Sequence, residues 1–184
     1  MADYITTYTE EHFYPTEPEA DKIKVEDIAH SLSLQCRGNG HVKSFFSVAQ
    51  HCINCAREAE ARGYSPRTVL ACLLHDASEA YMSDVPRPFK KELPSFTEWE
   101  DKLLDVIYEK WLGSPLTEEE ARLVKLVDDD MLYYDLKVLL NEIMDCPAPE
   151  LCIELSYNVR PFKDVEREYL ALFDRLYKAL SGEK

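Results

Sequence analysis

The sequence of 184 residues has no run of about 18 consecutive apolar residues, which a transmembrane helix would need. Only 5 residues are glycine and 10 are proline, which excludes a fibrous or low-complexity chain. The first twenty residues are acidic and polar and lack the basic start of a signal or transit peptide. These absences predict a cytoplasmic protein with a single domain, its core covering about 24–180 after an acidic segment 1–20.

Basic residues are also scarce, with 21 against 35 acidic residues and a formal net charge of −14. Binding to a nucleic acid polymer needs a basic surface that displaces counterions, so such a partner is not expected, and neither is a membrane. A small phosphorylated ligand remains compatible with this charge if a metal ion or a few Arg and Lys residues offset the field locally.

The six cysteines do not form the pattern of a disulfide scaffold, because no export signal accompanies them. Cys52 and Cys55 form a C-x-x-C within a helical pattern, without a second pair at zinc-finger spacing. We expect reduced cysteines that pack in the core, with a redox pair or a structural zinc pair as the alternatives.

The apolar residues recur at helical spacing almost throughout the chain, which predicts an all-α helical bundle. Ser65 and Pro66 supply an N-cap and a first helical residue, and Thr117-x-x-Glu120 forms a capping box. A second capping box is expected at Thr97-x-x-Glu100. The segment 82–96 contains three prolines and is expected to be mostly loop. The predicted helices cover about 24–34, 44–62, 65–76, 97–112, 117–144 and 163–180.

Three of these helices carry His or Asp where an apolar face would turn inward. His75 and Asp76 end the apolar stretch ACLL, His51 follows Val48 and Ala49, and Asp128 follows another apolar helical stretch. A lone inward His is usually a hydrogen-bonded core residue, but one cation would account for all four groups together. Mixed nitrogen and oxygen ligands favour a divalent ion such as Mn, Fe, Co, Ni or Zn.

The chain resembles the HD phosphohydrolase superfamily, in which a His, a His-Asp pair and a distant Asp form the signature. The segments EDIAHSLSLQCRGNGH, SVAQH, LLHDASEAYMSDVPRPFK and VKLVDDDML are similar to the small bacterial branch related to 5′-deoxynucleotidases. The resemblance covers roughly residues 26–140. It implies an HD-type fold with one divalent ion, Mg included among the candidates, held by His51, His75, Asp76 and Asp128.

The same resemblance assigns roles to residues around the expected ion. Glu79 matches the position that activates water, Asp84 an acidic residue near the substrate sugar, and Arg37 a residue linked to phosphate binding. His41 and Lys90 (or the following lysine) could assist in binding phosphate. Asp84 could instead stabilise a turn before Pro86, and Lys90 could be a surface charge.

The chain departs from the deoxynucleotidase pattern at two positions. Gly38 follows Arg37 where an aromatic residue is usual, and His41 belongs to the related small-hydrolase pattern. Asp135 matches an acidic position of the smaller branch without an assigned role. Asp130 is the alternative to Asp128 as the fourth ligand.

The sequence therefore predicts a metal-dependent phosphohydrolase that acts on a (deoxy)nucleoside 5′-monophosphate. A phosphodiesterase or pyrophosphohydrolase of a signalling nucleotide, a non-catalytic nucleotide-binding module and a purely structural bundle are the alternatives. The family resemblance is also compatible with a homodimer, for which Tyr169, Phe173 and Tyr177 form a candidate surface, unless this aromatic stripe belongs to the core.

Overall fold

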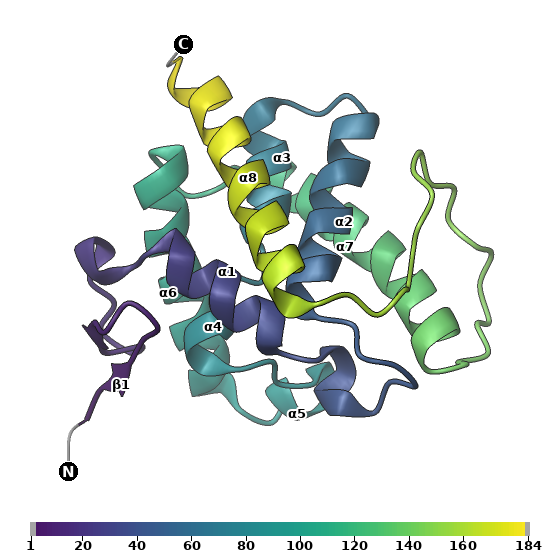
Figure 1. Cartoon of the computed structure of the whole chain (residues 1–184), viewed down its shortest axis with the longest axis horizontal. Coiled ribbons are helices and arrows are strands. Elements are labelled where there is room, and N and C mark those ends of the chain that lie inside the picture. Colours follow the sequence, from purple (N-terminus) through teal and green to yellow (C-terminus); the bar gives the residue numbers. More distant parts are fainter. Residues whose placement is uncertain (1–2, 183–184) are drawn as a thin grey trace.

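The computed structural model of the chain describes residues 3–182 and is built almost entirely of helices, which confirms the predicted all-α class (Figure 1). A small antiparallel hairpin, β1 (Ile5–Thr6) and β2 (His12–Phe13), precedes them. Short 3₁₀ turns lie at η1 (Ala20–Lys22) and η2 (Arg37–Gly40). The helices are α1 (Val25–Leu34), α2 (Val48–Ala61), α3 (Pro66–Leu74), α4 (Glu79–Met82), α5 (Arg87–Lys90), α6 (Pro94–Leu112), α7 (Glu118–Leu139) and α8 (Phe162–Ser181).

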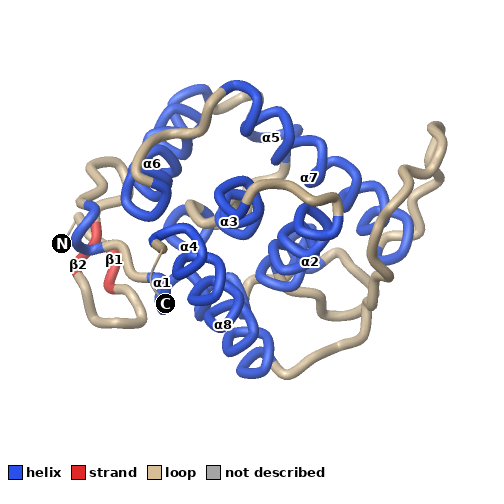
Figure 2. Tube along the Cα trace, turned by 90° about the horizontal axis from the view of Figure 1, so that it is seen from above, coloured by secondary structure: helices blue, strands red, loops and turns tan. Residues whose placement is uncertain are grey.

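Helix α3 lies at the centre of the bundle, surrounded by α2, α6, α7 and α8 (Figure 2). Its start follows the predicted chemistry, since the Ser65 side chain accepts a hydrogen bond from the backbone of Thr68 and Pro66 occupies the first helical position. Every residue from 68 to 74 is buried. The hydroxyl of Tyr169 on α8 donates to the carbonyl of Leu73 at 2.8 Å. The last turn of α3 is thereby held rigidly, and the residues that follow it are positioned by the core.

The N-terminal hairpin was not expected, and it adds to the core before residue 24. Phe13 is fully buried and its ring lies 4.3 Å from that of Tyr81. The carboxylate of Asp27, in the first turn of α1, accepts hydrogen bonds from the backbone and the hydroxyl of Thr9, at 2.7 and 2.9 Å. An acidic group at a helix N-terminus is favourable, so this contact also stabilises α1.

Several predicted helix boundaries were wrong. Helix α2 starts at Val48 rather than 44, because Ser47 and Gln50 form a capping box there. Helix α6 starts at Pro94, and the expected capping box at Thr97 is absent, since Glu100 binds Lys90 instead. The predicted box at Thr117 is confirmed, but α7 ends at Leu139, five residues before the expected end at 144.

The proline-rich segment 82–96 is less irregular than predicted. It follows directly from the single-turn helix α4 and contains a second such turn, α5, before α6 begins. Ser83, at the junction of α4 with the next segment, has a positive φ of 73°. These short elements hold the side chains from Glu79 to Lys90 over one end of α3.

The aromatic stripe on α8 belongs mainly to the core, although Tyr177 is partly exposed. Tyr169 and Phe173 are buried, and Phe173 packs edge-on against Trp111 with ring centroids 5.2 Å apart. In the part of the chain that the structure describes, no helix is both long and apolar enough to cross a bilayer.

Candidate metal centre

His51 lies on α2 and is the most deeply buried residue of the site, with 0% of its surface exposed. Its Nδ1 lies 2.9 Å from Oδ2 of Asp135 on α7. This carboxylate fixes the orientation of the ring and turns Nε2 toward the centre of the bundle. Nε2 lies 3.3 Å from Nε2 of His75.

His75 and Asp76 follow the last turn of α3. The Nδ1 of His75 lies 2.8 Å from the carbonyl of Cys72, so this nitrogen donates a hydrogen bond and Nε2 is the ring nitrogen that faces the other groups of the site. Asp76 Oδ1 lies 3.3 Å from this Nε2. The two neighbouring side chains therefore present a nitrogen and an oxygen to the same point.

Asp128 on α7 completes the group. Its Oδ1 lies 3.2 Å from Nε2 of His51 and 3.7 Å from Nε2 of His75. The neighbouring carboxylates turn elsewhere, because Asp129 pairs with Lys125 and Asp130 with Arg62. The structure thus brings the four predicted ligands together from three helices, with Asp128 rather than Asp130 at the centre.

The donor set fits a divalent metal ion. Two imidazole nitrogens and two carboxylates are typical ligands of transition metals, and each carboxylate lies 3.2–3.7 Å from at least one of the two imidazole nitrogens. Burial alone would lower the pKa of His51 and His75, yet nearby acidic groups raise both values well above the usual range. The site therefore favours positive charge at its centre. A buried group of His, Cys and Asp residues here could hold a metal ion.

Glu79 lies on α4 beside this group and is 5% exposed. Its Oε2 is buried and has no hydrogen-bond partner among residues 3–182. Burial and the negative charges of Asp76 and Asp84 raise its pKa well above the usual value. An unpaired buried carboxyl oxygen is costly unless a water or an ion satisfies it, so this oxygen is available to bind one beside the four ligands.

A cavity of about 500 Å³ opens over the group and is lined by Arg37, Glu79, Asp84 and Lys90. The guanidinium of Arg37 lies 3.5 Å from both Asp76 and Asp135. Lys90 Nζ lies 2.7 Å from Glu100 and 3.8 Å from Glu79. The structure places three of the predicted substrate-side residues plus Glu79 around one space.

Part of the cavity lining is apolar, and Gly38, the position that differs from the deoxynucleotidase pattern, also lines the cavity. Gly38 has a positive φ of 57°, a conformation that favours glycine. His41, also predicted to bind substrate, is exposed and does not line the cavity. The apolar side chains of the lining are Val42, Val85, Pro86, Pro88, Leu132, Leu136, Leu139 and Leu140.

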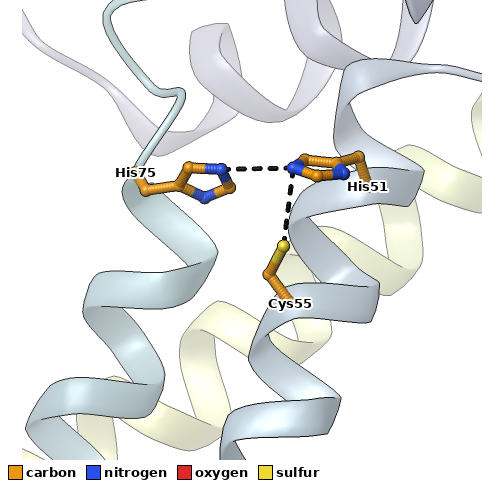
Figure 3. Close-up of side chains that lie close together, drawn as sticks. All are labelled: His51, Cys55 and His75. Carbon is orange, nitrogen blue, oxygen red and sulfur yellow. Dashed lines mark hydrogen bonds between the residues drawn. The ribbon is translucent and has the colours of Figure 1, made fainter. Parts of the chain in front are cut away.

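Sequence reasoning missed Arg87, assigned no role to Asp135 and expected Cys55 to pack in the core. Arg87 lines the cavity, and its Nη2 lies 2.8 Å from Oδ2 of Asp128. Asp135 matched an acidic position of the related family, and the structure shows that it contacts and orients His51. Cys55, one turn after His51, has its Sγ 3.5 Å from His51 Nε2 (Figure 3). The spacing of four residues from His51 would have indicated this contact.

The chain matches no protein-family model, but it is similar to known bacterial proteins. A stretch of 124 residues is 36% identical to the uncharacterized protein YfdR of Escherichia coli strain K12 and covers 67% of each chain. The chain belongs to the same family as YfdR. It is also 29% identical over 180 residues to an uncharacterized protein of Rhodobacter capsulatus, covering 90% of this chain and 91% of the relative. Neither relative carries a described activity, so the function rests on the site.

Proposed function

We propose that this chain is a metal-dependent phosphohydrolase of the HD type that hydrolyses a (deoxy)nucleoside 5′-monophosphate. One observation carries the proposal: the nitrogen and oxygen atoms of His51, His75, Asp76 and Asp128 converge beside Glu79, whose Oε2 is buried and unpaired within the described residues. A structural bundle has no use for this combination, because unpaired buried polar atoms destabilise the folded chain.

The four convergent residues would hold the ion. A divalent ion bound there would lower the pKa of a coordinated water and polarise a phosphoryl oxygen. Asp135 and the carbonyl of Cys72 would keep the two imidazole rings in the orientation that presents Nε2.

Glu79 would accept the proton of the attacking water. Its surroundings raise its pKa, and a carboxylate with a raised pKa is a stronger base than an exposed one. The position of Glu79 at the start of α4, one turn after Asp76, directs its carboxyl toward the same end of the cavity. The apolar side chains of the cavity lining would limit the access of bulk water to this base.

The cations at the rim would bind the phosphate. Arg37, Arg87 and Lys90 are all held by carboxylates of the site, so each is already directed toward the cavity. The planar guanidinium of Arg37 suits two phosphate oxygens. Asp84, half-buried at the rim, would accept a hydrogen bond from a sugar hydroxyl.

The test is phosphate release from a panel of ribo- and deoxyribonucleoside monophosphates with Mn²⁺, Co²⁺, Mg²⁺ or Zn²⁺. We expect turnover with at least one metal, and its loss in Asp128→Asn. Asp130→Asn is the matched control, because this carboxylate lies two residues after Asp128 on the same helix and pairs with Arg62 instead of the centre. Tight binding of a monophosphate without any turnover would favour a binding module, and cleavage of diesters alone would favour a phosphodiesterase.

A further inference from the structure

Cys55 takes part in the buried group but has no role in the proposed hydrolysis. It lies one turn after His51 on α2, is 1% exposed, and places Sγ 3.5 Å from His51 Nε2 (Figure 3). The ligand atoms of Cys55, His51 and His75 all lie within 4.8 Å of one another. A thiol therefore borders the two histidines on the side that faces the core.

The spacing of these atoms fits a tetrahedral zinc site. With Zn–N of about 2.0–2.1 Å and Zn–S of about 2.3 Å, tetrahedral angles separate two nitrogens by about 3.4 Å and a nitrogen and a sulfur by about 3.6 Å. The observed separations are 3.3 Å for His51 to His75 and 3.5 Å for His51 to Cys55. Asp128 Oδ1, at 3.2 and 3.7 Å from the two histidines, supplies a fourth ligand at similar spacing.

Hydrogen bonding among the side chains does not account for this arrangement. His51 Nε2 is approached by three atoms at once, from His75, Asp128 and Cys55, at 3.3, 3.2 and 3.5 Å. A ring nitrogen has either one proton or one lone pair, so it satisfies only one of these partners. A cation in the middle satisfies all four groups together.

We infer that the site has a second coordination mode, in which a thiophilic cation such as Zn²⁺ or Cd²⁺ is bound by His51, His75, Asp128 and Cys55. Harder ions such as Mn²⁺ take the carboxylate of Asp76 in place of the thiolate, since soft ligands select soft metals. On binding, the thiol of Cys55 releases its proton to solvent and the thiolate becomes the ligand.

This mode has a consequence for activity that rests on the proposed function. Four protein ligands close a tetrahedral site, whereas catalytic sites keep one position open for water. Excess Zn²⁺ or Cd²⁺ therefore inhibits the hydrolysis that Mn²⁺ or Co²⁺ supports, and the Cys55→Ser variant resists that inhibition.

The direct test is a Cd²⁺ titration of the full-length chain after removal of metals by chelation and dialysis. Cys146 and Cys152, whose side chains are exposed, are replaced by Ser in every sample to remove competing thiols. We expect an ultraviolet sulfur-to-cadmium charge-transfer band that saturates at about one Cd²⁺ per chain.

The comparison variant is Cys52→Ser, because Cys52 is equally buried on α2 and is the competing thiol, with its Sγ within 4.8 Å of the ligand atoms of His75 and Asp76. We expect this variant to keep the band and Cys55→Ser to lose it, with Cd²⁺ binding weakened at least about tenfold. Cys55→Ala serves as a second variant, and an unchanged helical circular dichroism spectrum shows that each variant is folded.

A full band in folded Cys55→Ser, or its loss in Cys52→Ser, would overturn the inference. The two proposals fail separately. If no metal supports phosphate release, the proposed hydrolase function is wrong. The cadmium band would still test whether Cys55 is a ligand. Equal turnover with Mn²⁺ and Zn²⁺ without any band would overturn the second mode alone.

Discussion

Helix α2 carries a buried ionic group near each end, and the two groups differ in whether all of their carboxylate oxygens have hydrogen-bond partners. Glu58, near the C-terminal end, is 0% exposed, and both of its oxygens are occupied. Arg62 donates at 2.8 Å, and the backbone amides of Cys152 and Ile153 donate at 3.0 and 3.1 Å. His51, near the other end, lies in a group whose partner Glu79 keeps an unpaired oxygen.

On the proposed function, the difference separates a structural ionic group from a functional one. The satisfied carboxylate of Glu58 fixes the long segment between α7 and α8, which extends away from the helices in Figure 1, to the bundle. The unsatisfied group near His51 gains nothing for stability, since unpaired buried polar atoms cost free energy. We therefore expect mutations in the first group to change stability, and mutations in the second to change activity.

The largest expected effect is on turnover in Glu79→Gln. Removing the proton acceptor should reduce kcat by about 10²–10⁴-fold. Burial raises the pKa of Glu79 in the folded chain above its pKa in the unfolded chain. The folded state therefore loses stability as the pH rises above the unfolded pKa, and Gln, which does not ionise, removes this loss. Thermal melting at neutral pH, in the presence of chelator, should therefore show equal or higher stability. A variant that keeps its turnover would remove Glu79 from the mechanism.

The complementary change is Glu58→Ala. It leaves two backbone amides without this acceptor, removes one partner of the buried pair with Arg62, and should lower the free energy of unfolding by about 3–5 kcal/mol. We expect the lower part of this range, because Arg62 keeps its ion pair with Asp130. Urea denaturation measures the loss, and turnover per folded chain should not change. A marked loss of turnover in the folded variant would contradict the separation of the two groups.

An intermediate effect is expected for Asp135→Asn. The amide keeps the shape of the side chain but weakens the hold on His51 Nδ1, and such changes typically reduce metal affinity about 10–100-fold. Competition with a chelator of known affinity measures this change. Asp130→Asn, on the same helix and paired with Arg62 of the other group, is the control whose metal affinity should stay as in the unaltered chain.

The smallest effect is expected for Arg87→Ala. Arg87 is more than half exposed, and exposed ion pairs contribute up to about 1 kcal/mol, equivalent to roughly fivefold in KM. We expect KM to rise and kcat to stay nearly constant, with the difference shrinking at high salt. A loss of kcat larger than the change in KM would place Arg87 at the reacting phosphate instead of the rim.

The helical class and most helix ends were predictable because they depend on local chemistry. Ser65 with Pro66 and Thr117 with Glu120 determine helix starts through contacts within four residues. Thr97 misled the prediction for a nonlocal reason, since the expected partner Glu100 binds Lys90 from another helix. The hairpin with Phe13 was missed because its two-residue strands are too short to show alternation.

The four predicted ligands could be identified from the apolar residues that surround them in the sequence. His51, His75, Asp76 and Asp128 each end or interrupt an apolar helical face, so the sequence placed them toward the core. Contacts made through tertiary packing could not be read in the same way. Arg87 lies in a proline-rich segment whose position is determined by contacts with distant parts of the chain. Asp135 has a role only because α2 places His51 beside it.

The central claim is that one divalent ion occupies the point where three helices meet. Elemental analysis of the purified chain, after equilibration with Mn²⁺ or Zn²⁺ and removal of excess ion, tests it most directly. We expect about one ion per chain, retained in Glu79→Gln and lost in His51→Ala and Asp128→Ala. A folded chain that binds no ion, or binds equally well without His51 and Asp128, would contradict it.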